Sequence, residues 1–184
     1  MNKFFLVAII LASMSLAAFG QKYITKNGMI KFHSEAPLET IEAINNQVNC
    51  AFDTETGDMV FKVLIKGFEF EKALMQEHFN ENYMYSDKYP NATFVGRVKD
   101  WEGSKLEEGM AMDVIVEGDL TIKGITNKVS EKGTLEMREG KIMAETIFPV
   151  TISDYEVKIP KTVIDNIAET VDVTVDVDLE KYQK

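Results

Sequence analysis

The sequence is poor in the residues that most metal sites and disulfide bonds require. Its 184 residues include one cysteine and two histidines. A single cysteine cannot form an internal disulfide bond or a cysteine-based zinc site, and two histidines leave little room for a histidine-rich metal centre. We therefore expect no metal and no cofactor.

Positive charge is also scarce. Aspartates and glutamates number 30 against 20 lysines and arginines, which gives a formal net charge of -10. Proteins that bind nucleic acid need a basic patch to neutralise phosphates, so nucleic acid is not an expected partner. The contents of 45% hydrophobic and 27% charged residues are ordinary for a folded globular protein and exclude intrinsic disorder.

The local signatures of common enzymes and calcium sites are missing. His33-Ser34-Glu35 places a histidine and a carboxylate on one strand face, but no nucleophile elbow accompanies them. Residues 53–58 offer oxygen ligands without the twelve-residue spacing and final glutamate of a calcium loop. We expect a protein that is not an enzyme and has no catalytic residues.

One long hydrophobic run is present, at the N-terminus. Lys3 precedes an apolar stretch over residues 4–11, and Ala18-Phe19-Gly20 follows with small residues. This pattern predicts a cleavable signal peptide over residues 1–20, the alternative being a buried N-terminal helix. The run is short for a membrane span and no cysteine follows for lipidation, so no stable membrane anchor is expected. We expect an exported protein, periplasmic or secreted.

The remaining residues, 21–184, are predicted to form one domain dominated by strands. Residues 171–179 place five apolar side chains on one face and four polar side chains on the other, as in a strand with one dry side. Residues 110–123 repeat this alternation, with Met112 and Val114 on the apolar face. Further strands are predicted over residues 29–35, 48–53, 58–70, 93–101, 129–137 and 141–153.

Two segments depart from strand periodicity. Residues 71–82 carry Leu74, Met75 and Phe79 at helical spacing. Residues 161–169, after Pro160, allow a short helix or an irregular crossing. Cys50 lies in a predicted strand and is interpreted as a small buried apolar residue, with a reactive thiol or an intermolecular bridge as the alternative.

Eight antiparallel strands are typical of a sandwich or a closed barrel. In a barrel the last strand would pair with the first. An eight-stranded barrel is either just filled by its own side chains or holds one small ligand, and the strand pattern leaves both open. The expected fold is therefore all-β, an antiparallel eight-stranded barrel with one or two short helices.

Two short sequence motifs, called words below, resemble those of a known family. Residues 78–90 read His-Phe-Asn-Glu-Asn-Tyr-Met-Tyr-Ser-Asp-Lys-Tyr-Pro, and residues 117–129 read Glu-Gly-Asp-Leu-Thr-Ile-Lys-Gly-Ile-Thr-Asn-Lys-Val. In this order they resemble the YceI-like family of exported lipocalin-like proteins. The usual aromatic pair is Met84-Tyr85 here, Ser86 replaces an aspartate, and Phe79 stands where leucine is common. A contact made by that aspartate is not carried over.

The same words also have a purely structural interpretation. Pro90 favours an extended residue before it, which suits the start of a strand. Gly118 within a strand is typical of a bulge or tight bend, and Gly124 of a turn. The words can therefore specify the barrel rather than any chemistry.

The resemblance implies an elongated barrel with an apolar channel that holds a long isoprenoid or related amphiphile. A chain of about 40 carbons at ~0.3 kcal/mol per atom would bind with roughly 12 kcal/mol, a nanomolar affinity. The alternative is a ligand-free exported barrel that acts through its acidic surface as an interaction or stress-associated module. The oligomeric state stays open, a homodimer included.

The site residues predicted under this resemblance fall into three groups. Six are expected to line the channel: Phe32, Phe61, Phe94, Met112, Val114 and Phe148. Three are expected to close one end: Leu74, Met75 and Phe79. Four are candidates for contacting the ligand head: His78, Tyr83, Tyr85 and Tyr89.

Overall fold

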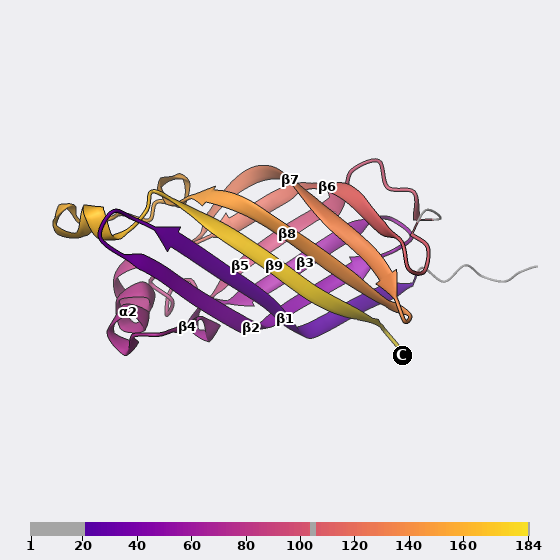
Figure 1. The fold of residues 1–184 in the computed structure, drawn as a ribbon, viewed down its shortest axis with the longest axis horizontal. Helices are drawn as coiled ribbons and strands as arrows, with labels where there is room; N and C mark the ends of the chain where they lie inside the picture. Colours follow the sequence, from indigo (N-terminus) through magenta and orange to yellow (C-terminus); the bar gives the residue numbers. More distant parts are fainter. Residues whose placement is uncertain (1–20, 104–105, 184) are drawn as a thin grey trace, which may run out of the picture.

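The computed structural model describes residues 21–103 and 106–183 and shows an elongated antiparallel barrel (Figure 1). The predicted signal peptide over residues 1–20 lies outside the described residues. The barrel strands are β1 (Lys22–Glu35), β2 (Thr40–Asp53), β3 (Asp58–Leu64), β5 (Asn91–Val98), β6 (Ala111–Ile122), β7 (Ile125–Arg138), β8 (Lys141–Thr151) and β9 (Thr170–Lys181).

The barrel closes through its first strand. The strands follow the order β1-β9-β8-β7-β6-β5-β3-β2, and β1 pairs antiparallel with both β9 and β2. A short extra strand, β4 (Glu69–Phe70), pairs with β2 outside this cycle. The predicted eight-stranded barrel and the pairing of first and last strands are confirmed, and the sandwich alternative is wrong.

The strand predicted over residues 58–70 is interrupted. β3 ends at Leu64, a 3-10 turn η1 (Ile65–Gly67) follows, and the chain returns as β4. The buried or half-buried apolar positions 59, 61, 63 and 65 are odd-numbered, whereas the next two, 68 and 70, are even-numbered. A strand has a strict period of two, so this change of phase requires a break at Lys66-Gly67.

Both segments without strand periodicity form short helical turns. Residues 71–82 become α2 (Ala73–His78), which continues as the π-helical turn η2 (Phe79–Tyr83). Residues 161–169 contain the 3-10 segment η5 (Lys161–Asn166), which is kinked at Val163 with φ -128° and ψ 17°. No helix in the described part of the chain is long and apolar enough to cross a membrane.

Two of the hairpins are joined along only part of their length. In the described chain β2 pairs with β3 only where residues 49–52 meet 59–62, and β7 pairs with β8 only where residues 134–138 meet 141–145. Both stretches adjoin their connecting turns. The barrel therefore consists of two four-stranded halves, β2-β1-β9-β8 and β7-β6-β5-β3, that join at one end and separate at two forks toward the other.

The end where the halves join, here called the packed end, is filled by side chains. Phe52 packs edge-on against Trp101 with ring centroids 5.2 Å apart, and Trp101 Nε1 donates to the carbonyl oxygen of Thr54 at 3.0 Å. Cys50 is buried in the same core, where burial raises the pKa of its thiol strongly. The prediction of a buried apolar cysteine is confirmed. Other fully buried core residues are Val48, Val98, Leu135, Ile142, Val177 and Leu179.

Two glycines face each other across β5 and β6. Gly96 and Gly118 are register partners, and a Cβ atom built on Gly118 would lie 2.5 Å from the Cα atom of Gly96. A Cβ atom on Gly96 would collide with the carbonyl oxygen of Glu117 and with the ring of Phe94. The pair therefore lets the strands and the Phe94 ring approach closely, which agrees with the tight bend expected at Gly118.

Gly96→Ala is expected to lower the free energy of unfolding by about 1–3 kcal/mol, because the added methyl group overpacks a site bounded by backbone. Urea unfolding monitored by Trp101 fluorescence measures the change. Val95→Ala is the matched control, since the Val95 side chain is 56% exposed on the opposite face. Equal stability of Gly96→Ala and the wild type would contradict the close approach.

Candidate ligand-binding cavity

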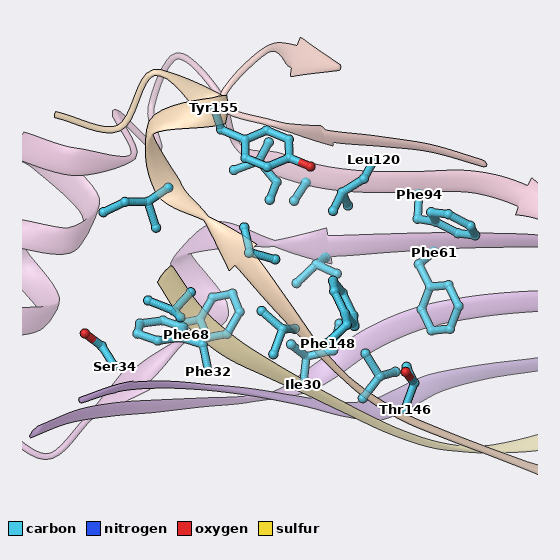
Figure 2. A pocket seen from close by; sticks show the side chains of 18 of the residues that line it. Ile30, Phe32, Ser34, Phe61, Phe68, Phe94, Leu120, Thr146, Phe148 and Tyr155 are labelled. Atoms are coloured by element: carbon cyan, nitrogen blue, oxygen red, sulfur yellow. The ribbon is translucent and has the colours of Figure 1, made fainter. Parts of the chain in front are cut away.

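A cavity of about 410 Å³ lies between the separated halves of the barrel (Figure 2). All eight barrel strands contribute to its wall, together with β4, α2 and the segments after β8. The wall along β6 extends from Val114 to Ile122, eight steps of about 3.3 Å or roughly 26 Å of strand. The cavity is within the usual size range of small-molecule sites, about 300–1,000 Å³.

Four phenylalanines form one side of the cavity. The ring of Phe79 in η2 is stacked on Phe32 of β1 at 5.6 Å between centroids, and lies 5.0 Å from Phe70 and 5.7 Å from Phe68. Phe32 contacts Phe68 at 5.5 Å. Offset and edge-on contacts of this kind stabilise aromatic clusters. The cluster attaches α2, η2 and β4 to the first half of the barrel.

A second aromatic pair lies deeper, toward the packed end. Phe61 of β3 and Phe94 of β5 are register partners, with ring centroids 6.3 Å apart. Figure 2 shows the two rings next to each other, tilted edge to face, at one end of the pocket. The absence of a side chain at Gly96 leaves room for the Phe94 ring. The cavity wall continues past this pair toward the packed end, to Met59 and Val116.

Polar contacts tie together the chain segments at the opposite end, here called the helical end. Lys72, just before α2, donates to Glu39 Oε1 at 2.8 Å, and Asn166 of η5 donates to Glu39 Oε2 at 3.4 Å. The hydrogen bond from Lys72 holds the pKa of Glu39 below its usual range. Ser34, 2% exposed, accepts a hydrogen bond from the backbone N–H of Ala168 at 3.0 Å.

Two tyrosines present hydroxyl groups at or beside the wall. Tyr155, at the end of the 3-10 turn η4 (Ile152–Tyr155), is 5% exposed. Figure 2 shows its ring across the cavity from Phe32 and near Leu120. Burial raises the pKa of both Tyr155 and Tyr83. Both hydroxyls therefore stay protonated at neutral pH and can donate a hydrogen bond.

Nine of the thirteen predicted site residues lie on the cavity wall. They are Phe32, Phe61, Met75, His78, Phe79, Tyr83, Phe94, Val114 and Phe148. Their side chains come from β1, β3, β5, β6, β8, α2 and η2. Contact between these residues and a ligand stays a prediction.

The other four predicted residues lie away from the wall. Leu74 is on the solvent side of α2 with 61% of its side chain exposed. Met112 lies two positions beyond Val114 toward the packed end, opposite Leu135, and is not part of the wall. Neither side chain is part of the cavity wall, and contact of these two residues with a ligand stays a prediction.

Tyr85 and Tyr89 hold the β6–β7 turn instead of facing the cavity. Lys123 Nζ lies 4.8 Å from the centroid of the Tyr85 ring, which is 49% exposed. A Cβ atom on Gly124 would lie 2.7 Å from Cε1 of Tyr89. The two sequence words therefore meet in space, and these parts of them serve the fold.

A family model for the YceI-like domain matches residues 23–179. The chain belongs to the YceI-like family. Among proteins with curated descriptions, none matches it significantly.

Solved structures share the barrel fold with this YceI-like chain. A polyisoprenoid binding domain from Saccharophagus degradans, implicated in plant cell wall breakdown, aligns with a TM-score of 0.77 and 14% identity over 89% of this chain and 99% of that one. BcnA of Burkholderia cenocepacia aligns with a TM-score of 0.68 and 17% identity, over 83% and 95%. The YCEI protein of Campylobacter jejuni has a TM-score of 0.53 and 15% identity, over 72% and 78%. At such identities the likeness concerns the fold.

Sequence reasoning missed several wall residues of the YceI-like barrel. Phe68 and Phe70 were not predicted as wall residues because residues 58–70 were interpreted as one strand. The change of phase of the inward apolar residues at Lys66-Gly67 indicates the break. Tyr155 had no usable signal, because the segment after β8 lacks periodicity and its position depends on tertiary contacts.

The cavity wall is suited to non-covalent binding of an apolar molecule. The wall is almost entirely apolar, with a few hydroxyl, carboxylate and imidazole groups at its edges. In the described residues no three histidine, cysteine, aspartate or glutamate side chains gather as metal ligands. Such a wall gains binding energy by removing apolar surface from water, about 25 cal/mol per Å².

Acid is expected to loosen the helical end of the barrel. The pKa of Glu39 is lowered in the folded state, so its stabilising contribution is present above the pKa of an unfolded glutamate and is lost as pH falls through the folded value. Protection of the α2 and η5 amides against hydrogen exchange, corrected for intrinsic rates, should fall between neutral pH and about pH 3.

Glu39→Gln should show this loss of protection already at neutral pH. Glu180→Gln removes a carboxylate paired with Lys141 at the packed end and should leave α2 unchanged. Constant α2 protection from neutral pH to about pH 3 would contradict the role of Glu39.

Proposed function

We propose that this protein binds a long-chain isoprenoid-type or other amphiphilic lipid in the cavity and carries or sequesters it. The observation that carries the proposal is the elongated apolar space between the two halves of the barrel. Its wall along β6 is long enough for several isoprene units laid end to end. The structural neighbour described as a polyisoprenoid binding domain supports the same class of ligand.

The proposed activity is binding without catalysis. Desolvation of an apolar chain supplies affinity without any reactive group, and a small number of polar groups suffices to orient the ligand. The aromatic cluster around Phe79 and the pair Phe61–Phe94 give the wall large, rigid contact surfaces. A carrier needs these properties and needs no nucleophile or metal.

The proposed location is the periplasm, with secretion as the alternative. The support is the signal-peptide pattern of residues 1–20. A lipid with a long hydrocarbon chain has a negligible solubility in such an aqueous compartment. A barrel that encloses the chain would allow it to exist there away from a membrane.

Native mass spectrometry of the protein purified from its own host tests the proposal. We expect a reproducible adduct with the mass of a long-chain amphiphile, which is lost on denaturation. A clean apo mass, together with no binding of added geranylgeraniol, would contradict the proposal and favour the ligand-free interaction module.

A cavity-filling substitution locates the ligand. Val116 lies on the cavity wall, whereas its neighbour Ile115 points outward and is 40% exposed. Val116→Phe should weaken geranylgeraniol binding at least tenfold, about 1.4 kcal/mol, because the added ring occupies space that the chain needs. Ile115→Phe is the matched control and should bind like the wild type. Equal affinities of the two variants would place the ligand elsewhere.

A further inference from the structure

The two forks of the barrel are closed differently. At the β2–β3 fork the buried side chain of Asn45 donates to the carbonyl oxygen of Leu64 at 2.8 Å, and β4 pairs with β2 beyond it. Phe68 and Phe70 then fill the space between the strands. Protein chain therefore occupies this fork along its length.

The β7–β8 fork has less to cover it. Backbone pairing stops at Thr134 and Glu145, so in the described chain residues 125–133 and 146–151 have no ladder between them. Thr146 Oγ1 donates to the carbonyl oxygen of Lys132 at 2.6 Å where the strands part. Farther along, Asn127 Nδ2 donates to the carbonyl oxygen of Asp154 at 2.8 Å, which places η4 over the far end.

At this fork the cavity and an outer groove lie on the two sides of the same segment of wall. A groove outside the barrel is lined by residues from β6, β7, β8 and β9, and six residues line both the groove and the cavity. Two of them, Lys132 and Glu145, are exposed on the outer face. The shared residues define what we call the β7–β8 slit: Lys132, Gly133, Thr134, Glu145, Thr146 and Val175.

Apart from the hydrogen bond between Thr146 and Lys132, several polar groups at the slit have no partner among the described residues. The unpaired strand edges carry backbone N–H and C=O groups, which require hydrogen bonds from water or a ligand. Glu131 shares the inward face of β7 with Val129 and Leu135 and lines the cavity. Its carboxylate makes no hydrogen bond or ion pair with another described residue. Its negative charge contributes to the raised pKa of Tyr155, after burial as the main cause. A hydrocarbon chain cannot satisfy these groups.

The charges around the slit select among ligand head groups. Glu131 faces the cavity. The described residues of the outer groove include three carboxylates, those of Asp113, Glu145 and Asp176, and one ammonium group, that of Lys132. Like charges brought together without compensation oppose binding. A phosphate or carboxylate head is therefore disfavoured, whereas a hydroxyl or amine can donate to Glu131.

We propose that the β7–β8 slit is the head-group site of the lipid cavity. In this arrangement the apolar tail lies between the halves of the barrel. A neutral or cationic head that donates hydrogen bonds lies at Glu131 and the unpaired strand edges. This inference rests on the proposed function and adds a position and a chemical class for the head.

The test compares two probes with the same tail, geranylgeraniol and geranylgeranyl phosphate, in equilibrium binding to the full mature chain. We expect the wild type to bind the alcohol at least tenfold more tightly than the phosphate. Glu131→Gln should reduce this preference to within threefold, and Glu131→Lys should reverse it. Glu117→Gln removes the same charge from the outer face of the neighbouring strand β6 and should retain the wild-type preference.

A second measurement does not depend on substitutions. Backbone amide NMR shifts on addition of geranylgeraniol should include residues 130–134 and 145–147 on the two sides of the slit. Shifts confined to the helical end, around Glu39, α2 and η5, would overturn the assignment of the slit as the head-group site.

The outcomes separate the two proposals. Binding of both probes with an unchanged preference in Glu131→Gln would overturn the slit proposal and leave the proposed function standing. Binding of neither probe by the wild type would overturn the proposed function and the slit proposal with it. The expected reversal in Glu131→Lys, with a wild-type result for Glu117→Gln, would support both.

Discussion

Incomplete strand pairing is the constraint on which the rest of this structure depends. β2–β3 and β7–β8 are hydrogen-bonded only near their turns, so the barrel is narrow at the packed end and opens toward the helical end. The narrow end brings inward side chains such as Phe52 and Leu179 into full contact. Where the halves separate, the same alternation of apolar residues produces a lined cavity instead of a core.

The separated strands must still satisfy their backbone groups, and the chain does so in two ways. At the β2–β3 fork, Asn45 and β4 supply hydrogen bonds and the phenylalanine cluster fills the gap. At the β7–β8 fork, a single threonine hydroxyl bridges the strands near their last pair. The difference gives the cavity one side closed by aromatic packing and one side with polar edges.

The family words serve the architecture of the barrel more than its chemistry. Tyr85 and Tyr89 from the first word pack on Lys123 and Gly124 from the second, which fixes the β6–β7 turn against the segment after α2. Other members of both words lie on the cavity wall: His78, Phe79, Tyr83 and Met84 from the first, and Leu120, Ile122 and Val129 from the second. Ser86, where the family has an aspartate, is 3% exposed and forms part of this packed region.

The sequence by itself determined the approximate positions of the eight strands and the alternation of apolar side chains along them, because alternation with period two is a local property of the chain. The closure of β1 on β9 followed only once a barrel was assumed. Of the nine predicted residues that lie on the wall, five are on strands, where the alternation places them, and four are on α2 and η2. Tertiary structure decided where the halves separate, how far the cavity extends toward Met112, and that Tyr155 and Glu131 lie beside it. Those features depend on where pairing between strands stops. The residues adjacent to a strand residue in the sequence do not determine which residue of another strand it pairs with.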